Sequence, residues 1–79
     1  MPKYLYNAKK TLRELGDARA SETQLRRELE HGTVTPSRAE ELNAALRLAQ
    51  AAVARAADAW DAIAVTLTAG EIRRVVAAL

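Results

Sequence analysis

Apolar side chains recur at alternating steps of three and four residues through the second half of this chain. The members of this stripe are Ala39, Leu42, Leu46, Ala49, Val53, Ala56, Trp60, Ile63 and Leu67. Such steps place the side chains on one narrow face of an α-helix and are typical of coiled-coil packing. The pattern therefore predicts a long helix that buries one stripe against a neighbouring helix.

The first part of the chain carries a second stripe that fits this neighbour. Its members are Leu5, Ala8, Leu12, Leu15, Ala18, Glu22, Leu25 and Leu29. The interval of three is repeated from Leu15 to Ala18, beside Gly16, which predicts a stammer or a mild bend. We expect Glu22 to tilt outward and pair with Arg26 one turn later. The alternative is a buried carboxylate that fixes the register of a larger assembly.

Residues between the two stripes predict a tight connection. Gly32 fits the C-terminal end of a helix with a positive φ. Thr35 fits an N-cap followed by Pro36 at the first helical position, and Ser37 with Glu40 offers an alternative capping box. The two predicted helices are thus joined by a loop of only a few residues.

The two stripes and this loop agree on one register. In an antiparallel pair of helices, the sequence numbers of facing residues have a nearly constant sum. The sum is 68 or 67 for the stripe pairs Leu5–Ile63, Ala8–Trp60, Leu12–Ala56, Leu15–Val53, Ala18–Ala49, Glu22–Leu46, Leu25–Leu42 and Leu29–Ala39. Half of 68 is 34, which falls inside the loop. The sequence therefore predicts a coiled-coil-like antiparallel helical hairpin.

A short third helix is expected at the C-terminal end. Thr68 and Glu71 have the spacing of a capping box. The helix would carry an apolar face made of Ile72, Val75, Val76 and Leu79. This face either folds back onto the open end of the hairpin or swaps onto a second subunit.

These signals predict an all-α fold in which residues 1–79 form a single helical domain. The expected helices cover about 3–31, 36–66 and 69–78, and Pro2 suits the first turn of the first one.

Self-association is expected because this hairpin is small. A chain of 79 residues is near the lower limit for a self-sufficient core, and without cysteine it forms neither disulfides nor thiolate metal sites. The second helix also carries apolar residues outside its stripe, so it has room for a further neighbour. We expect a homodimer with a four-helix-type bundle, and the alternative is a monomeric three-helix bundle. The candidate contacts with a second copy or another protein are Leu48, Ala52, Ala59, Val65, Val76 and Leu79.

Catalytic chemistry is not expected from this sequence. The one histidine, His31, lies in the predicted turn, and Asp58 and Asp61 lie among alanines on what we interpret as a solvated face. No glycine-rich phosphate-binding loop is present. We therefore predict no catalytic residue, no metal site and no cofactor. The expected function is a non-enzymatic protein-interaction module, a regulator or adaptor whose protein partner is unidentified.

Nucleic-acid binding is the alternative function. The net charge is only +2, but residues 1–13 carry four cations and no acid. Cations neutralise phosphates, and tyrosines stack on unpaired bases. Positive charge in a first helical turn also opposes the helix dipole. The candidate contacts are Lys3, Tyr6, Lys9, Lys10 and Arg13.

Membrane association is not expected. No apolar run approaches the ~20 residues of a membrane span. Residues 1–6 lack the apolar stretch of a signal peptide. We therefore expect a cytoplasmic protein.

Overall fold

The computed structural model describes residues 3–79, so the expectation for Pro2 lies outside the described residues. Helix α1 covers Lys3–His31, α2 covers Pro36–Ala64 and α3 covers Ala69–Ala77. The described residues contain no strand. The all-α prediction is confirmed, and α2 ends at Ala64, two residues before the expected end. The chain tightens there because the amide and the hydroxyl of Thr66 both donate to the Ile63 carbonyl, at 3.0 and 2.7 Å.

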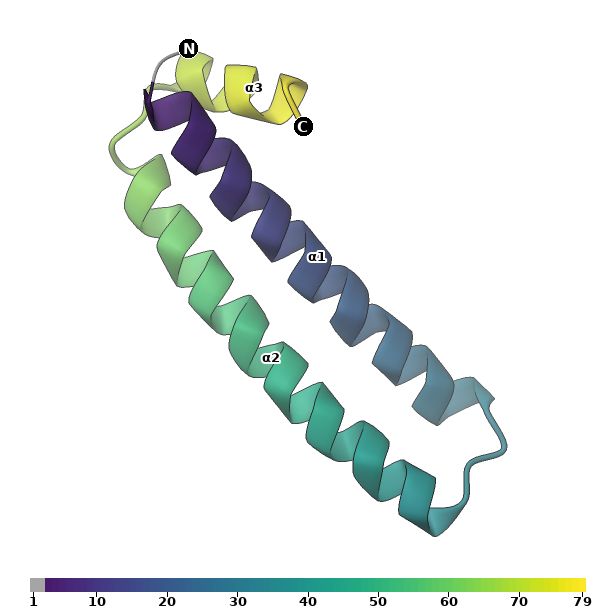
Figure 1. Cartoon of the computed structure of the whole chain (residues 1–79). Helices are drawn as coiled ribbons and strands as arrows, with labels where there is room; N and C mark the ends of the chain where they lie inside the picture. Colours follow the sequence, from purple (N-terminus) through teal and green to yellow (C-terminus); the bar gives the residue numbers. More distant parts are fainter. Residues whose placement is uncertain (1–2) are drawn as a thin grey trace.

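Helices α1 and α2 run antiparallel and side by side (Figure 1). The molecule is elongated, with extents of 49 × 19 × 18 Å. Every residue of the two predicted stripes is buried or partly buried, and Ala8, Leu15 and Leu42 are at most 3% exposed. The predicted helical hairpin is therefore confirmed.

The one acid in the stripes leans towards solvent. Glu22 keeps 18% of its side chain exposed, and its Oε1 lies 3.4 Å from Nη1 of Arg26. The expected pairing one turn later is confirmed. Because this carboxylate is partly hydrated and paired, the hairpin does not bury an isolated charge.

The connection between α1 and α2 is made largely as expected. Thr35 is the N-cap of α2, and its hydroxyl accepts a hydrogen bond from the Arg38 amide at 3.2 Å. The predicted positive φ of Gly32 is wrong. A Cβ at this glycine would lie 2.8 Å from the Glu28 carbonyl oxygen, which also accepts from the Gly32 amide at 3.1 Å. Glycine is therefore needed here for a close approach and not for a left-handed backbone.

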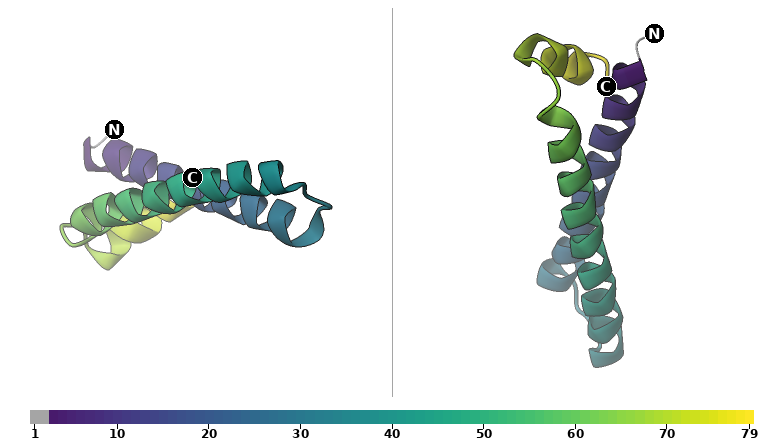
Figure 2. Two further views of the ribbon diagram at one scale, coloured as in Figure 1. Left: turned by 90° about the horizontal axis from the view of Figure 1, so that it is seen from below. Right: turned by 90° about the vertical axis from the view of Figure 1, so that its left-hand side faces the viewer.

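Helix α3 packs back against α1 of the same chain, near the start of α1 (Figure 2). Its predicted capping box is present: the Thr68 hydroxyl accepts from the Glu71 amide, and the Glu71 carboxylate accepts from the Thr68 amide. The predicted apolar face is only partly buried. Val75 is fully buried, whereas Val76 and Leu79 are each 55% exposed. The buried face is narrow because a helix that packs against one neighbour covers only one stripe.

Candidate functional site

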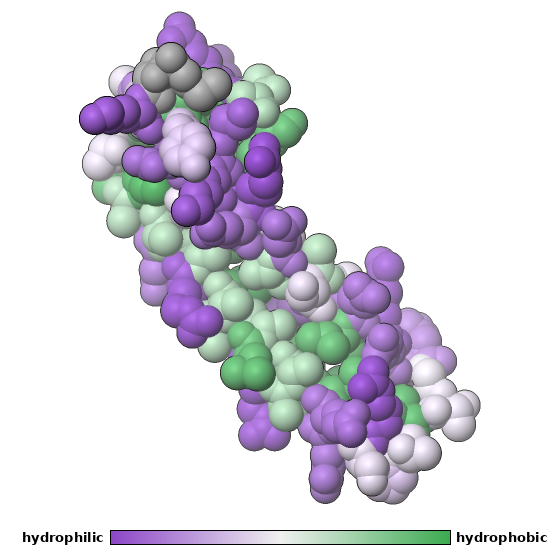
Figure 3. All heavy atoms as spheres, viewed as in Figure 1, coloured by the Kyte–Doolittle hydropathy of each residue, from purple (hydrophilic) through white to green (hydrophobic). Residues whose placement is uncertain are grey.

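The two broad sides of the hairpin differ. Helix α3 lies on the side that faces away from the viewer in Figure 1, as the view from below shows (Figure 2). The opposite side is drawn in Figure 3, where hydrophobic atoms follow α2 and the line along which the two helices meet. Hydrophilic atoms cover α1 towards its N-terminal end on this side. The hairpin therefore leaves an apolar region uncovered.

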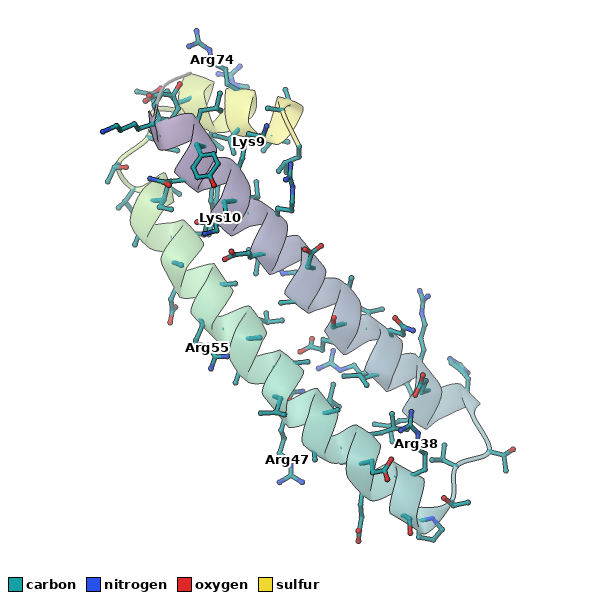
Figure 4. The ribbon with its side chains drawn as sticks, in the orientation of Figure 1. Lys9, Lys10, Arg38, Arg47, Arg55 and Arg74 are labelled. Atoms are coloured by element: carbon teal, nitrogen blue, oxygen red, sulfur yellow. The ribbon has the colours of Figure 1, made fainter. Side chains whose placement is uncertain are left out.

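A groove runs between α1 and α2 on this uncovered side. Lys9 lies beside α3 (Figure 4), and helical geometry places Glu14 on a different side of α1 from Lys9. The groove is shallow because alanine side chains are small, and we call it the alanine groove. Its lining residues are Glu14 and Ala18 from α1 and Ala52, Arg55, Ala56 and Ala59 from α2.

Charged side chains lie at two levels along the uncovered side, one near the middle of the hairpin and one near the loop. Glu14 and Arg55 line the alanine groove from different helices, and within residues 3–79 neither side chain makes an ion pair. Towards the loop, Arg38 lies between the helices (Figure 4) and its Nη2 is 3.3 Å from Oε2 of Glu28. Nη1 of Arg38 also lies 3.1 Å from Oε2 of Glu41. Each level thus has an acid on α1 and an arginine on α2.

Some of the predicted partner contacts lie at the alanine groove, and the others lie away from it. Leu48 is 73% exposed and shares one flank of α2 with Ala52 and Ala59, both of which line the alanine groove. We call the alanine groove together with Leu48 the groove face. Val65 is 83% exposed but lies at the end of α2, on another side of the helix. The remaining contacts, Val76 and Leu79, lie at the C-terminal end, beyond the groove face.

The candidate contacts predicted from the sequence lack four lining residues of the groove: Glu14, Ala18, Arg55 and the stripe residue Ala56. A signal for Arg55 was present, because it precedes Ala59 by one helical turn and follows Ala52 by three residues. Ala18 was identified only as a stripe residue. Glu14 carried no signal of its own.

The candidate nucleic-acid contacts are mostly brought together. Tyr6, Lys9, Lys10 and Arg13 line one hollow on α1, and Lys3 is exposed but does not line it. Two acids, Glu14 and Asp17, line the same hollow. These carboxylates lower the positive potential that the four cations of this segment would otherwise produce. In Figure 4, Lys9 and Lys10 also point in different directions.

Among residues 3–79, no group of three or more His, Cys, Asp or Glu side chains is placed to hold a metal ion. No helix in the described part of the chain has the length and apolar character to cross a membrane.

Comparison of the chain with known protein families, curated proteins and solved structures finds no match.

Proposed function

We propose that this protein is a non-enzymatic helical interaction module that self-associates through the groove face. The observation that carries the proposal is Leu48, a large apolar side chain that is 73% exposed beside a groove of alanines. Alanines allow a second helix pair to approach closely, and two hairpins packed in this way form a four-helix bundle. The same assembly would let a regulator or adaptor present its outer helical surfaces to another protein.

The exposed area supports this proposal. The chain exposes 5695 Å². A compact monomer of 8.6 kDa is expected to expose roughly 4,700 Å² by the general scaling of surface with mass. The excess of about 1,000 Å² is similar to the ~800 Å² that each partner buries in a stable interface. A homodimer would therefore remove the excess that the elongated hairpin leaves.

Replacing Leu48 by glutamate is expected to weaken this self-association by at least about tenfold, because it places a charge in the centre of an apolar contact on both copies. The measurement is sedimentation velocity over a range of protein concentration. We expect wild-type protein to sediment as a dimer at about 50 µM and the variant as a monomer.

The matched control is Val65→Glu, which adds the same charge at an exposed valine on another side of α2. This variant should remain dimeric. A wild-type monomer at this concentration, or equal loss of dimer in both variants, would remove the proposal.

Nucleic-acid binding is the second candidate, and the hollow lined by Tyr6, Lys9, Lys10 and Arg13 is the observation that favours it. If Lys3 and the three cations of this hollow all contact phosphates, the affinity for a single-stranded oligonucleotide should fall by about fifty-fold between 50 and 200 mM salt. Fluorescence anisotropy measures this change. The double variant Lys9→Glu with Lys10→Glu should abolish binding.

The control for the double variant is Arg27→Glu with Arg47→Glu, which changes the net charge equally away from the hollow. Equal loss of binding in both double variants would indicate that binding depends on net charge alone and not on the hollow. Absence of binding by wild-type protein at 50 mM salt would exclude this function.

A further inference from the structure

We propose that the second copy packs on the groove face with the two-fold axis along the hairpin, so that Arg55 of each copy pairs with the partner's Glu14. This inference rests on the proposed self-association and adds the orientation of the two copies. The occupant of the alanine groove is therefore a second copy of this chain, and the charges on the uncovered side set its direction.

The positions of these charges along the hairpin follow from its register. Facing residues have numbers that sum to about 68, so Arg55 lies level with residue 13, next to Glu14. Both side chains line the alanine groove. Arg38 is level with residue 30 and makes the 3.3 Å ion pair with Glu28 that bridges α1 and α2. At both levels, the acid is on α1 and the base is on α2.

Two symmetric arrangements can bring one groove face onto another. In a two-fold dimer, the same surface patch is used by both copies. With the axis along the hairpin, α1 of one copy lies over α2 of the other at the same level. Arg55 then meets the partner's Glu14, and Arg38 meets the partner's Glu28. Both contacts join opposite charges.

The second arrangement has the axis across the hairpin. Here α1 lies over the partner's α1, and the loop end of one copy lies over the open end of the other. Glu14 then approaches the partner's Glu28, which brings like charges together. Complementary charge fixes the orientation of an interface because juxtaposed like charges are costly. The arrangement along the hairpin is therefore favoured.

Glu14 and Arg55 are the pair best able to act between copies. Within residues 3–79 they make no ion pair, whereas Arg38 and Glu28 are already paired in the same chain. An interface over the alanine groove would also remove water around both groups, which strengthens their attraction. We thus expect most of the orientation-dependent effect at positions 14 and 55.

The test uses charge reversal and sedimentation velocity on the full chain. Arg55→Glu alone and Glu14→Arg alone should each weaken the dimer by about tenfold, because each creates two like-charge contacts per dimer. The double variant should recover the wild-type dissociation constant to within about twofold. Arg47→Glu is the matched control, since Arg47 does not line the alanine groove, and it should leave the dimer unchanged. Circular dichroism checks that each variant keeps its helices.

Mixing the two single variants separates a contact between copies from one within a chain. In the proposed arrangement, an equimolar mixture brings each reversed charge opposite its complement on the other chain. The mixture should form a heterodimer about as tight as the wild-type dimer, measured by native mass spectrometry with one chain isotope-labelled. A contact within one chain gives no such recovery.

The outcomes distinguish the two proposals. If wild-type protein is dimeric but neither the double variant nor the mixture restores association, the orientation is wrong and self-association stands. If wild-type protein is monomeric, self-association itself is wrong.

Discussion

Replacing Val75 by aspartate should detach α3 from α1 and raise the hydrogen-exchange rates of the α3 amides by about a hundredfold. Val75 is fully buried against α1 in the described structure. Transfer of an unpaired carboxylate into such a site costs about 3 kcal/mol or more, so α3 would leave α1 and place the charge in water. The amides of α1 and α2 near the loop should keep their protection. Hydrogen exchange followed by mass spectrometry measures both regions in one experiment.

Val76→Asp is the matched control for this prediction. Val76 is the next residue along the chain and is 55% exposed, so the same charge there stays hydrated. Protection of α3 should change by no more than about threefold, because surface substitutions have small effects. Equal loss of protection in both variants would show that α3 is not held through Val75.

Truncating Leu42 to alanine should lower the free energy of unfolding by about 2–4 kcal/mol. Leu42 is 2% exposed and belongs to the α2 stripe. Its removal takes away buried apolar surface and leaves a cavity that an elongated two-helix core cannot fill. Among residues 3–79, only Ala8, Leu15, Leu42 and Val75 are almost completely buried, so one leucine is a large part of this core. Urea denaturation followed by circular dichroism gives the value.

Protein concentration must be fixed in this comparison, because self-association stabilises the folded state by mass action. Leu79→Ala makes the same chemical change at a side chain that is 55% exposed. We expect a loss below about 0.5 kcal/mol for this control. If Leu42→Ala lowered the free energy of unfolding by as little as this control, the stripes would not form the core.

Much of the fold was predictable because its signals are local. The two apolar stripes report which face of each helix is buried, and Thr35 and Thr68 mark helix starts through hydrogen bonds made within one turn. The register followed from combining the stripes with the loop.

The errors in prediction concern backbone conformation and the packing of α3. The backbone at Gly32 avoids the left-handed conformation, although the Glu28 carbonyl that it approaches is only four residues away. The burial of Val75 without Val76 depends on the angle at which α3 meets α1.

The candidate site was predictable on one helix only. The flank of α2 with Leu48, Ala52 and Ala59 follows from helical periodicity. Glu14 and Arg55 line one groove, and only the position of α3 shows that this groove lies on the uncovered side. The register alone already placed these two residues at one level.

The position of α3 also bears on how the hairpin stays closed. Leu29 and Ala39 are 10 residues apart in sequence, whereas Leu5 and Ile63 are 58 apart, so the chain segment joining each facing pair lengthens with distance from the loop. The entropy cost of closing such a segment rises with its length, and the end distant from the loop is therefore the end most prone to fraying. Helix α3 packs at that end, against the first turns of α1 (Figure 1). Because α3 follows α2 in the chain and packs against α1, it holds the two long helices together at the end that the loop restrains least.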